Sequence, residues 1–371
     1  MKVLIAPDSF KECMNAYEAC LAIQEGFYQG EKNIITSLCP LADGGEGTLE
    51  TLMYAMKGKI EYYKVHGPLM NIIQAPIGFV DNIAIIECAK VCGLELLKEN
   101  QKNPYQTTSY GLGELIQHAL NQEVKHIIIC LGGSATNDGG IGMLQALGVR
   151  FFNQYYQNVV PTMKGLFDIQ DMNQDLLDLR LKNVSIIGVC DVTNPLCGCQ
   201  GATYIYGPQK GVALGEREMI DQAMKNYAYK VKNLLQCDYM NFPSTGAAGG
   251  LGFALKAFLN ATLEKGFDVV STILHLEEFI QDSDVIIVGE GKIDRQTQYG
   301  KTPYGVLKIA QKYHKDVFAF AGKVEDLEIL KELGFKNVYQ ITPKDMDLCT
   351  ALKIGKENLK ECVYQHIGEI L

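Results

Sequence analysis

The stretch HIIICLGGSATNDGG, residues 126–140, joins an apolar run to a turn that is rich in glycine. The run is as long as a strand, and its lack of polar alternation is typical of a strand buried on both faces of a parallel sheet. The glycines and small polar residues that follow favour a turn that opens a helix. A strand, a glycine turn and a helix in this order predict an α/β fold.

Strand-sized apolar runs recur along the chain, and helical spacing follows several of them. Apolar side chains between residues 49 and 56 fall on one face of a helix, and Thr302 as N-cap with Pro303 after it predicts the start of another. The further predicted strands, also expected to be buried on both faces, are residues 3–6, 34–38, 84–87, 184–189, 285–288 and 317–321.

The predicted strands divide into an outer and an inner group. We expect two α/β domains, the first a Rossmann-like, doubly wound domain formed by both chain ends, residues 1–66 and 269–371. The second α/β domain, residues 67–268, is inserted in the middle. No linker rich in proline, glycine or serine separates the two, so these boundaries depend on the strand pattern alone.

Composition excludes several classes of function. The chain has 371 residues, 47% of them hydrophobic, and a formal net charge of -9 without a cluster of lysine or arginine, so we expect no nucleic-acid or membrane partner. No apolar run approaches the ~18 residues of a membrane span, and no signal-peptide pattern opens the chain, so a cytoplasmic protein is expected. The 12 scattered cysteines are then expected to be reduced thiols.

Glycine and small polar or acidic residues coincide in four segments. A helix start with free N–H groups favours an anion, glycine lets a phosphate approach the backbone, and a nearby aspartate can hold Mg²⁺. One such segment alone is best read as an ordinary strand-to-helix connection, whereas four together favour phosphate chemistry. The four segments are residues 43–48, 132–140, 246–252 and 289–294.

Two other nucleotide-binding signatures are missing. Gly300-Lys301-Thr302 resembles the end of a Walker A loop, but Arg295 stands where the upstream glycine should be. The turn after the first strand, residues 6–9, lacks a GxGxxG pattern, which disfavours a dehydrogenase. The other alternative function is a module that binds sugar acids without catalysis. Such a module would need no carboxylates for Mg²⁺.

Six motifs follow one another along the chain: APDSFK (6–11), ADGGEGT (42–48), residues 131–140, CDVTNPL (190–196), GPQKG (207–211) and GEGKID (289–294). In this order they resemble the bacterial glycerate kinase family over most of the chain, up to about Gly322. This resemblance implies ATP-dependent phosphorylation of D-glycerate to 2-phosphoglycerate, with 3-phosphoglycerate left open, at an active site between two domains. After Gly322 the sequence continues with Lys323-Val324-Glu325, which departs from the family pattern, so no roles are carried over there.

The resemblance implies roles for acidic and basic residues in these motifs. Asp191 is expected to be the catalytic base, although an aspartate in this sequence also suits an Asx turn. Lys11 is the second expected catalytic residue, which would neutralise a phosphate or the glycerate carboxylate. The expected substrate-binding residues are Asp8, Ser9, Lys210 and Arg295. The expected Mg²⁺ ligands are Asp43, Glu290 and Asp294.

Each of these roles has a structural alternative. Asp294 could instead pair with Lys292 or Arg295, and Ser9 with Glu12 could instead form a capping box, for which Asn15 with Glu18 is a rival.

The remaining expected residues bind the nucleotide or its phosphates. They are Gly44, Gly45, Gly132, Gly133, Ser134, Thr136, Asn137, Gly249, Gly250, Gly289, Gly291 and Lys301. The expected partners are therefore ATP, Mg²⁺ and glycerate, and the sequence leaves homo-oligomerisation open.

Overall fold

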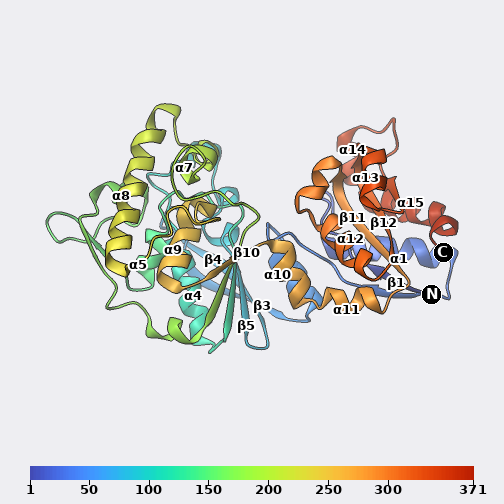
Figure 1. Cartoon of the computed structure of the whole chain (residues 1–371), viewed down its shortest axis with the longest axis horizontal. Helices are drawn as coiled ribbons and strands as arrows, with labels where there is room; N and C mark the ends of the chain where they lie inside the picture. The colour runs from blue at the N-terminus through green and yellow to red at the C-terminus, as the bar shows by residue number, and fades with distance from the viewer. The chain divides into compact units, whose positions relative to one another are not determined.

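The computed structural model describes all residues, 1–371, and the chain forms two compact units (Figure 1). The first unit consists of residues 1–43, 50–57 and 266–371, and the second of residues 44–49 and 58–265. Each unit contains a β-sheet with helices packed on it, which confirms the predicted α/β class. Both chain ends belong to the first unit.

The first unit is built on a parallel sheet with the strand order β13-β12-β11-β1-β2. The chain moves from β1 outward to β2, and later from β11 outward to β13 in the opposite direction. The strand order therefore reverses between β1 and β11, where doubly wound sheets bind their ligands. The strands are β1 (Lys2–Ile5), β2 (Ile35–Leu38), β11 (Val285–Ile293), β12 (Asp316–Val324) and β13 (Asn337–Gln340).

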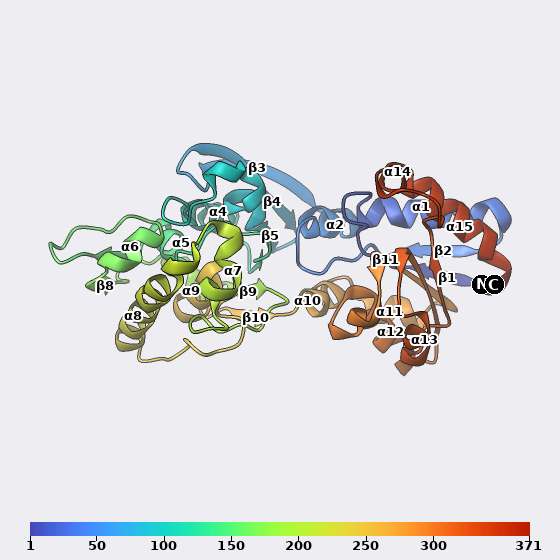
Figure 2. The ribbon, with the colours of Figure 1, turned by 90° about the horizontal axis from the view of Figure 1, so that it is seen from above.

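Helices cover both faces of this sheet (Figure 2). One face carries α1 and α15, whose apolar side chains pack on alternate residues of the central strands, such as Ile5, Ile287 and Phe320. The opposite face carries α10 to α13. The helices are α1 (Ala16–Gly30), α10 (Gly266–Ile273), α11 (Leu276–Gln281), α12 (Thr302–Lys312), α13 (Leu327–Leu333), α14 (Leu348–Lys353) and α15 (Gly355–Ile370).

The second unit is built on a mixed sheet with the order β10-β9-β6-β5-β4-β3. Its strands β5, β6, β9 and β10 are parallel, while β3 and β4 add an antiparallel hairpin and β7 pairs with β8 separately. The strands are β3 (Lys59–His66), β4 (Ile72–Val80), β5 (Ile83–Glu87), β6 (His126–Cys130), β7 (Arg150–Phe152), β8 (Asp171–Asn173), β9 (Ser185–Val189) and β10 (Thr262–Glu264).

The helices of the second unit enclose one large apolar core with the inner residues of β5 and β6, including Ile86 and Ile129. They are α3 (Ala89–Cys92), α4 (Tyr110–Asn121), α5 (Ile141–Ala146), α6 (Met163–Asp168), α7 (Ala202–Tyr206), α8 (Arg217–Leu235) and α9 (Leu251–Leu259). One further helix, α2 (Thr48–Ala55), lies on a segment that joins the two units.

The structure corrects one domain boundary and two strand predictions. Residues 59–66, assigned from the sequence to the first domain, form β3 and pair with β4 in the second unit. Residues 34–38 are not buried on both faces, because β2 is an edge strand whose Ile35 is 61% exposed. Residues 289–293 continue β11 in register with β12 instead of forming a turn, since the neighbouring strand extends equally far.

Two predicted helix starts are also resolved. The capping box is formed by Asn15 and Glu18 at the start of α1, so the rival pair Ser9 and Glu12 caps no helix. The N-cap of α12 is Lys301 and not Thr302, whose hydroxyl is instead bonded to a carboxylate. Proline occupies the first turn of α12 as expected.

No helix is long and apolar enough to span a bilayer. The cysteines form no disulfide, and seven of the 12 are buried. Their thiols therefore act as small apolar groups in the cores, as the core cluster around Cys88 and Cys92 illustrates.

Helices α1 and α15 touch at a glycine, which gives a test of this contact. A Cβ atom at Gly26 would lie 2.6 Å from the Lys360 carbonyl oxygen and 2.8 Å from Val363 Cβ. We therefore expect Gly26→Ala to lower the urea midpoint measured by circular dichroism, although alanine usually stabilises a helix interior by about 1 kcal/mol. Gly368→Ala in α15, where no atom lies within 4 Å, should not lower it. Equal midpoints for the two variants would contradict this packing.

Candidate functional site

Three carboxylates of the first unit act on one another near the carboxyl ends of β1 and β11. Asp8 follows β1, and its N–H donates to the Gly289 carbonyl of β11 at 2.9 Å. Glu290 is the next residue of β11, and Asp43 is on the segment after β2. The charges of Asp43 and Glu290 both act on Asp8, and that of Asp43 acts on Glu290. We call Asp8, Asp43 and Glu290 the acidic group.

Asp8 is held in one orientation by hydrogen bonds. The Thr302 hydroxyl donates to Oδ2 at 2.6 Å, and the Ser9 N–H donates to Oδ1 at 2.6 Å. Burial, followed by repulsion from Asp43, raises the pKa of the Asp8 carboxyl to about 7, and the two hydrogen bonds oppose this rise. Asp8 therefore accepts a proton far more readily than an exposed aspartate does.

Glu290 combines one strong ion pair with one unsatisfied oxygen. Lys301 Nζ lies 2.7 Å from Oε1 and also donates to the Lys292 carbonyl at 3.1 Å. The buried Oε2 atom has no hydrogen-bond partner. Burial raises the pKa of Glu290, against the attraction of Lys301 and Lys11. A cation bound at Oε2 would offset the repulsion between Glu290 and Asp43 and would give Oε2 the partner that it lacks.

Asp294 has partners of its own beyond the end of β11. Its side chain caps the short helix η7 (Arg295–Tyr299) by accepting from the Gln296 N–H at 2.9 Å. Lys292 Nζ lies 3.1 Å from Oδ2. Burial alone would raise the pKa of Asp294, but Lys292 and the cap leave it lowered. The structure thus provides the ion pair with Lys292 that the sequence offered as an alternative, while Arg295 is exposed.

The structure does not place the three expected metal ligands together. No group of three or more histidine, cysteine, aspartate or glutamate side chains is arranged to hold a metal ion. Mg²⁺ commonly takes only one or two carboxylates and completes its shell with water and substrate phosphates. The acidic group suits a Mg²⁺ site of this kind, in which water and phosphates complete the shell. Asp294 takes no part in the interactions among Asp8, Asp43 and Glu290.

Gly289 and Gly291 have a packing role in the strand. A Cβ atom at Gly289 would lie 3.0 Å from the Phe320 carbonyl oxygen and 3.1 Å from the ring of Phe10. At Gly291 the nearest atoms are in the backbone of Phe10 and Lys11. The absence of side chains here lets the loop after β1 lie directly on β11, which brings exposed Lys11 towards Glu290.

A second set of expected residues follows β6 in the second unit. We call residues 132–137 the glycine turn. The backbone N–H groups of Gly132, Gly133 and Ser134 donate to no protein acceptor, and Gly133 has a left-handed φ of +70°. Consecutive free N–H groups around a left-handed residue form a concavity that suits an anion. Gly133 is exposed, so this concavity is open to solvent.

Lys210 lies under the glycine turn with its side chain buried. Its Nζ donates to Ser134 Oγ at 2.9 Å and to the Thr136 carbonyl at 2.8 Å. Burial lowers the pKa of Lys210 to about 8, and the charges of Cys88, Cys92 and Asp138 oppose this decrease. Lys210 therefore braces the turn directly, in addition to its expected role with substrate.

Other glycines shape the surroundings of the turn. Gly249 and Gly250 both have left-handed φ, and a Cβ at Gly249 would lie 2.0 Å from the Thr136 carbonyl oxygen. Their structural contribution is close packing beneath the glycine turn. On its other side, a Cβ at Gly132 would lie 3.3 Å from Gly45 Cα, so the segment with Gly44 and Gly45 lies against the turn.

Asp191 follows β9, next to β6 in the same sheet, and its side chain is exposed. Parallel neighbours end at the same edge of a sheet, so Asp191 is on the edge that carries the glycine turn. Among residues that the sequence analysis missed, Thr302 bonds to Asp8, and Cys88 and Cys92 adjoin Lys210. No local motif marks these residues, because only the fold brings them to their partners.

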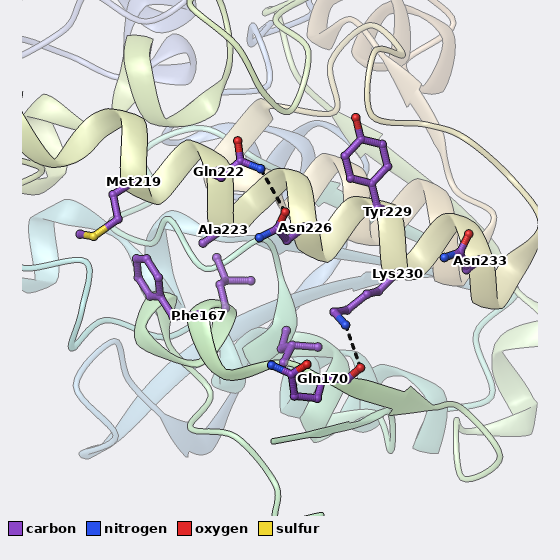
Figure 3. A pocket seen from close by; sticks show the side chains of 11 residues that line it. Phe167, Gln170, Met219, Gln222, Ala223, Asn226, Tyr229, Lys230 and Asn233 are labelled. Carbon is purple, nitrogen blue, oxygen red and sulfur yellow. Dashed lines mark hydrogen bonds between the residues drawn. The ribbon is translucent and has the colours of Figure 1, made fainter. Parts of the chain in front are cut away.

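A separate groove of about 610 Å³ lies between α6 and α8 (Figure 3). Its lining is apolar and amide-rich, with Phe167, Met219 and Gln222 among its residues, and contains no acidic side chain. Its one lysine, Lys230, donates to the Gln170 carbonyl at 2.8 Å. None of the expected site residues lines this groove, and it offers no group suited to phosphoryl transfer.

Comparisons with known proteins agree on one family. The sequence model of the glycerate kinase family matches residues 3–370. A Bacillus cereus protein named glycerate kinase is 41% identical over 363 residues, covering 97% of this chain and 95% of that protein. An Escherichia coli protein named glycerate 2-kinase is 41% identical over 362 residues, with the same two coverages.

A solved structure gives the same result. The crystal structure of a protein described as glycerate kinase 2, from Salmonella typhimurium LT2, superposes with a TM-score of 0.91 at 41% identity and covers 100% of this chain and 98% of that one. These similarities extend over both units. The chain belongs to the glycerate kinase family.

Proposed function

We propose that this protein is an ATP- and Mg²⁺-dependent kinase that transfers a phosphoryl group to D-glycerate, at its 2-hydroxyl. The observation that carries the proposal is the match of the glycerate kinase family to residues 3–370. The choice of the 2-hydroxyl is supported by the name of the Escherichia coli relative, glycerate 2-kinase. The 3-hydroxyl is the alternative that product analysis must exclude.

The acidic group supports the dependence on a divalent cation. Asp43 and Glu290 are the residues that would hold Mg²⁺, because their charges repel each other and Glu290 Oε2 is buried without a partner. When bound, ATP would supply the phosphoryl group and Mg²⁺ would neutralise charge on its phosphates. Lys301, which pairs with Glu290 Oε1, and Lys11 would add positive charge near these phosphates. Asp294 is a weaker candidate because Lys292 already pairs with it.

The proton of the glycerate hydroxyl needs an acceptor. Asp191, the base expected from the resemblance, is exposed. Asp8 is buried and is held in one orientation by Thr302 and Ser9, as a positioned general base must be. We therefore propose Asp8 for this role and keep Asp191 as the alternative.

The second unit would bind anionic parts of the substrates. The free N–H groups of the glycine turn suit a carboxylate or a phosphate, and the segment with Gly44 and Gly45 extends this surface. That the residues of both units act on one pair of substrates is part of the proposal, as is the substrate role of Ser9 and Arg295.

The activity itself is tested by incubating the purified protein with ATP, Mg²⁺ and either D- or L-glycerate. We expect ATP consumption with D-glycerate and 2-phosphoglycerate as the product, identified by ³¹P and ¹H NMR. Reactions without glycerate and reactions with EDTA are the controls, and both should consume no ATP. If neither isomer is turned over, the proposed function is wrong. If the product is 3-phosphoglycerate, the hydroxyl that is phosphorylated is the 3-hydroxyl and not the 2-hydroxyl.

The base is identified by comparing two amide variants. If Asp8 accepts the proton, Asp8→Asn should lower kcat by roughly 10²- to 10⁴-fold, the usual contribution of a general base. Asp191→Asn should then lower kcat by much less, and Asp171→Asn, at an exposed position of β8, should match the wild-type protein. The reverse ranking of the first two variants would assign the base to Asp191. Circular dichroism of each variant checks that it is folded.

The metal role of Glu290 is tested by the Mg²⁺ dependence of the rate. We expect Glu290→Gln to raise the Mg²⁺ concentration for half-maximal activity by about 10- to 100-fold, because a neutral amide binds Mg²⁺ more weakly than a carboxylate does. Glu277→Gln is the matched control, since this half-exposed glutamate also pairs with a lysine, Lys312. An unchanged Mg²⁺ requirement in the Glu290 variant would exclude this residue from the metal site.

A further inference from the structure

Lys210 is an unusual cation because it is buried without an ion pair. Its side chain is 2% exposed, and both of its hydrogen bonds go to neutral oxygens, Ser134 Oγ and the Thr136 carbonyl. Asp138 acts on it only at a distance, because that carboxylate is bonded to Ser109 and Gly140. A buried ammonium without a counter-charge costs folding free energy, so an anion supplied by a ligand would complete this arrangement.

Two donors at this place have no acceptor in the protein. An ammonium has three N–H donors, and Lys210 uses two. Ser134 Oγ accepts from Lys210, which directs its own hydroxyl proton elsewhere, and that proton reaches no protein acceptor. The free N–H groups of Gly132, Gly133 and Ser134 lie in the same turn. Donors therefore outnumber acceptors around the glycine turn, which is the signature of an oxyanion position.

We propose that Lys210 is a positioning residue that orients the Ser134 hydroxyl and the glycine turn, and that together they bind one oxyanion of a substrate. The inference deepens the proposed function by naming the group recognised, a carboxylate of glycerate or a phosphate of the nucleotide. Lys210 acts through the turn, since its Nζ donates to Ser134 Oγ and to the Thr136 carbonyl, and the neighbouring Gly133 is exposed to solvent. A merely structural role for Lys210 would hold the turn in place without any dependence on the charge of Lys210.

The charge dependence gives a test that needs no variant. Burial lowers the pKa of Lys210 to about 8, and a bound oxyanion raises it again, so the affinity should be constant below about pH 8 and fall above it. The decrease should be at most about tenfold per pH unit, with uptake of up to one proton on binding. The groups that face Lys210 are Cys88 and Cys92, at the start and end of α3, and Asp138 after the glycine turn.

Isothermal titration calorimetry with the full chain measures this directly. D-glycerate and ADP are titrated separately between about pH 7 and about pH 9.5, each in two buffers of different ionisation enthalpy, which reveals proton uptake. We expect one of the two ligands to show both the loss of affinity and the proton uptake, and that ligand carries the recognised oxyanion. A flat pH profile without proton uptake for both ligands would overturn the proposal.

Variants separate the positioning role from folding. Lys210→Met should weaken binding of that ligand about tenfold or more at pH 7, the worth of about one charge-assisted hydrogen bond, and abolish its pH dependence. Lys230→Met is the matched control, because Lys230 also donates to a backbone carbonyl but lies in the separate groove. If Lys230→Met weakened binding equally, or Lys210→Met bound like the wild-type protein, the proposal would be wrong.

Ser134 provides the second route to the same answer. If Lys210 acts through Ser134, the double variant of Lys210→Met and Ser134→Ala should bind no more than about twofold more weakly than Lys210→Met alone. Fully additive losses would refute the link between the two residues. These experiments measure binding and not turnover. If the protein failed to phosphorylate glycerate, the proposed function would be wrong, but pH-dependent binding of an oxyanion at the glycine turn could still be observed.

Discussion

The parallel pairing of β1 with β11 is the constraint on which the first unit depends. It aligns Val3 with Val285, so the two ends of the chain share one sheet although more than two hundred residues separate them. The 208 residues from Gly58 to Lys265 consequently form their own sheet and core in the second unit. The same pairing creates the reversal of strand order at which Asp8, just after β1, meets β11, the strand of Glu290. Without it, the acidic group would not exist.

Both candidate sites bury charge at a cost to stability. In the first unit, Asp8 is buried beside two other carboxylates, and in the second Lys210 is buried without an ion pair. Folded proteins usually avoid such arrangements unless partners compensate the charge. Here the protein compensates it only in part, through Thr302 and Ser9 in one case and through Ser134 and the Thr136 carbonyl in the other. The uncompensated charge is negative at Asp8 and positive at Lys210. Such a pair of sites suits a reaction that brings together a cation and substrate anions.

The sequence pattern predicted the central strands well, because long apolar runs have few alternative structures. It missed β3, β4, β7, β8, β10 and β13, most of which are short or half-exposed strands without a long apolar run. It also misread residues 289–293 as a turn, since glycine here serves the close approach of Phe10 and not a change of direction. The local pattern around a glycine cannot distinguish these two uses.

The same limit applies to side chains with chemical roles. Lys210 stands in a motif, but its burial under the glycine turn depends on β6, α3 and the segment at 208–210 meeting in space. Thr302 looked like an ordinary helix cap, and only the return of the chain to β1 turns its hydroxyl towards Asp8, 294 residues away. The sequence pattern around a residue therefore does not by itself reveal the function of that residue here. Position at a motif selects the candidates, whereas burial and the sign of the surrounding charge decide which of them can hold an anion, a cation or a proton.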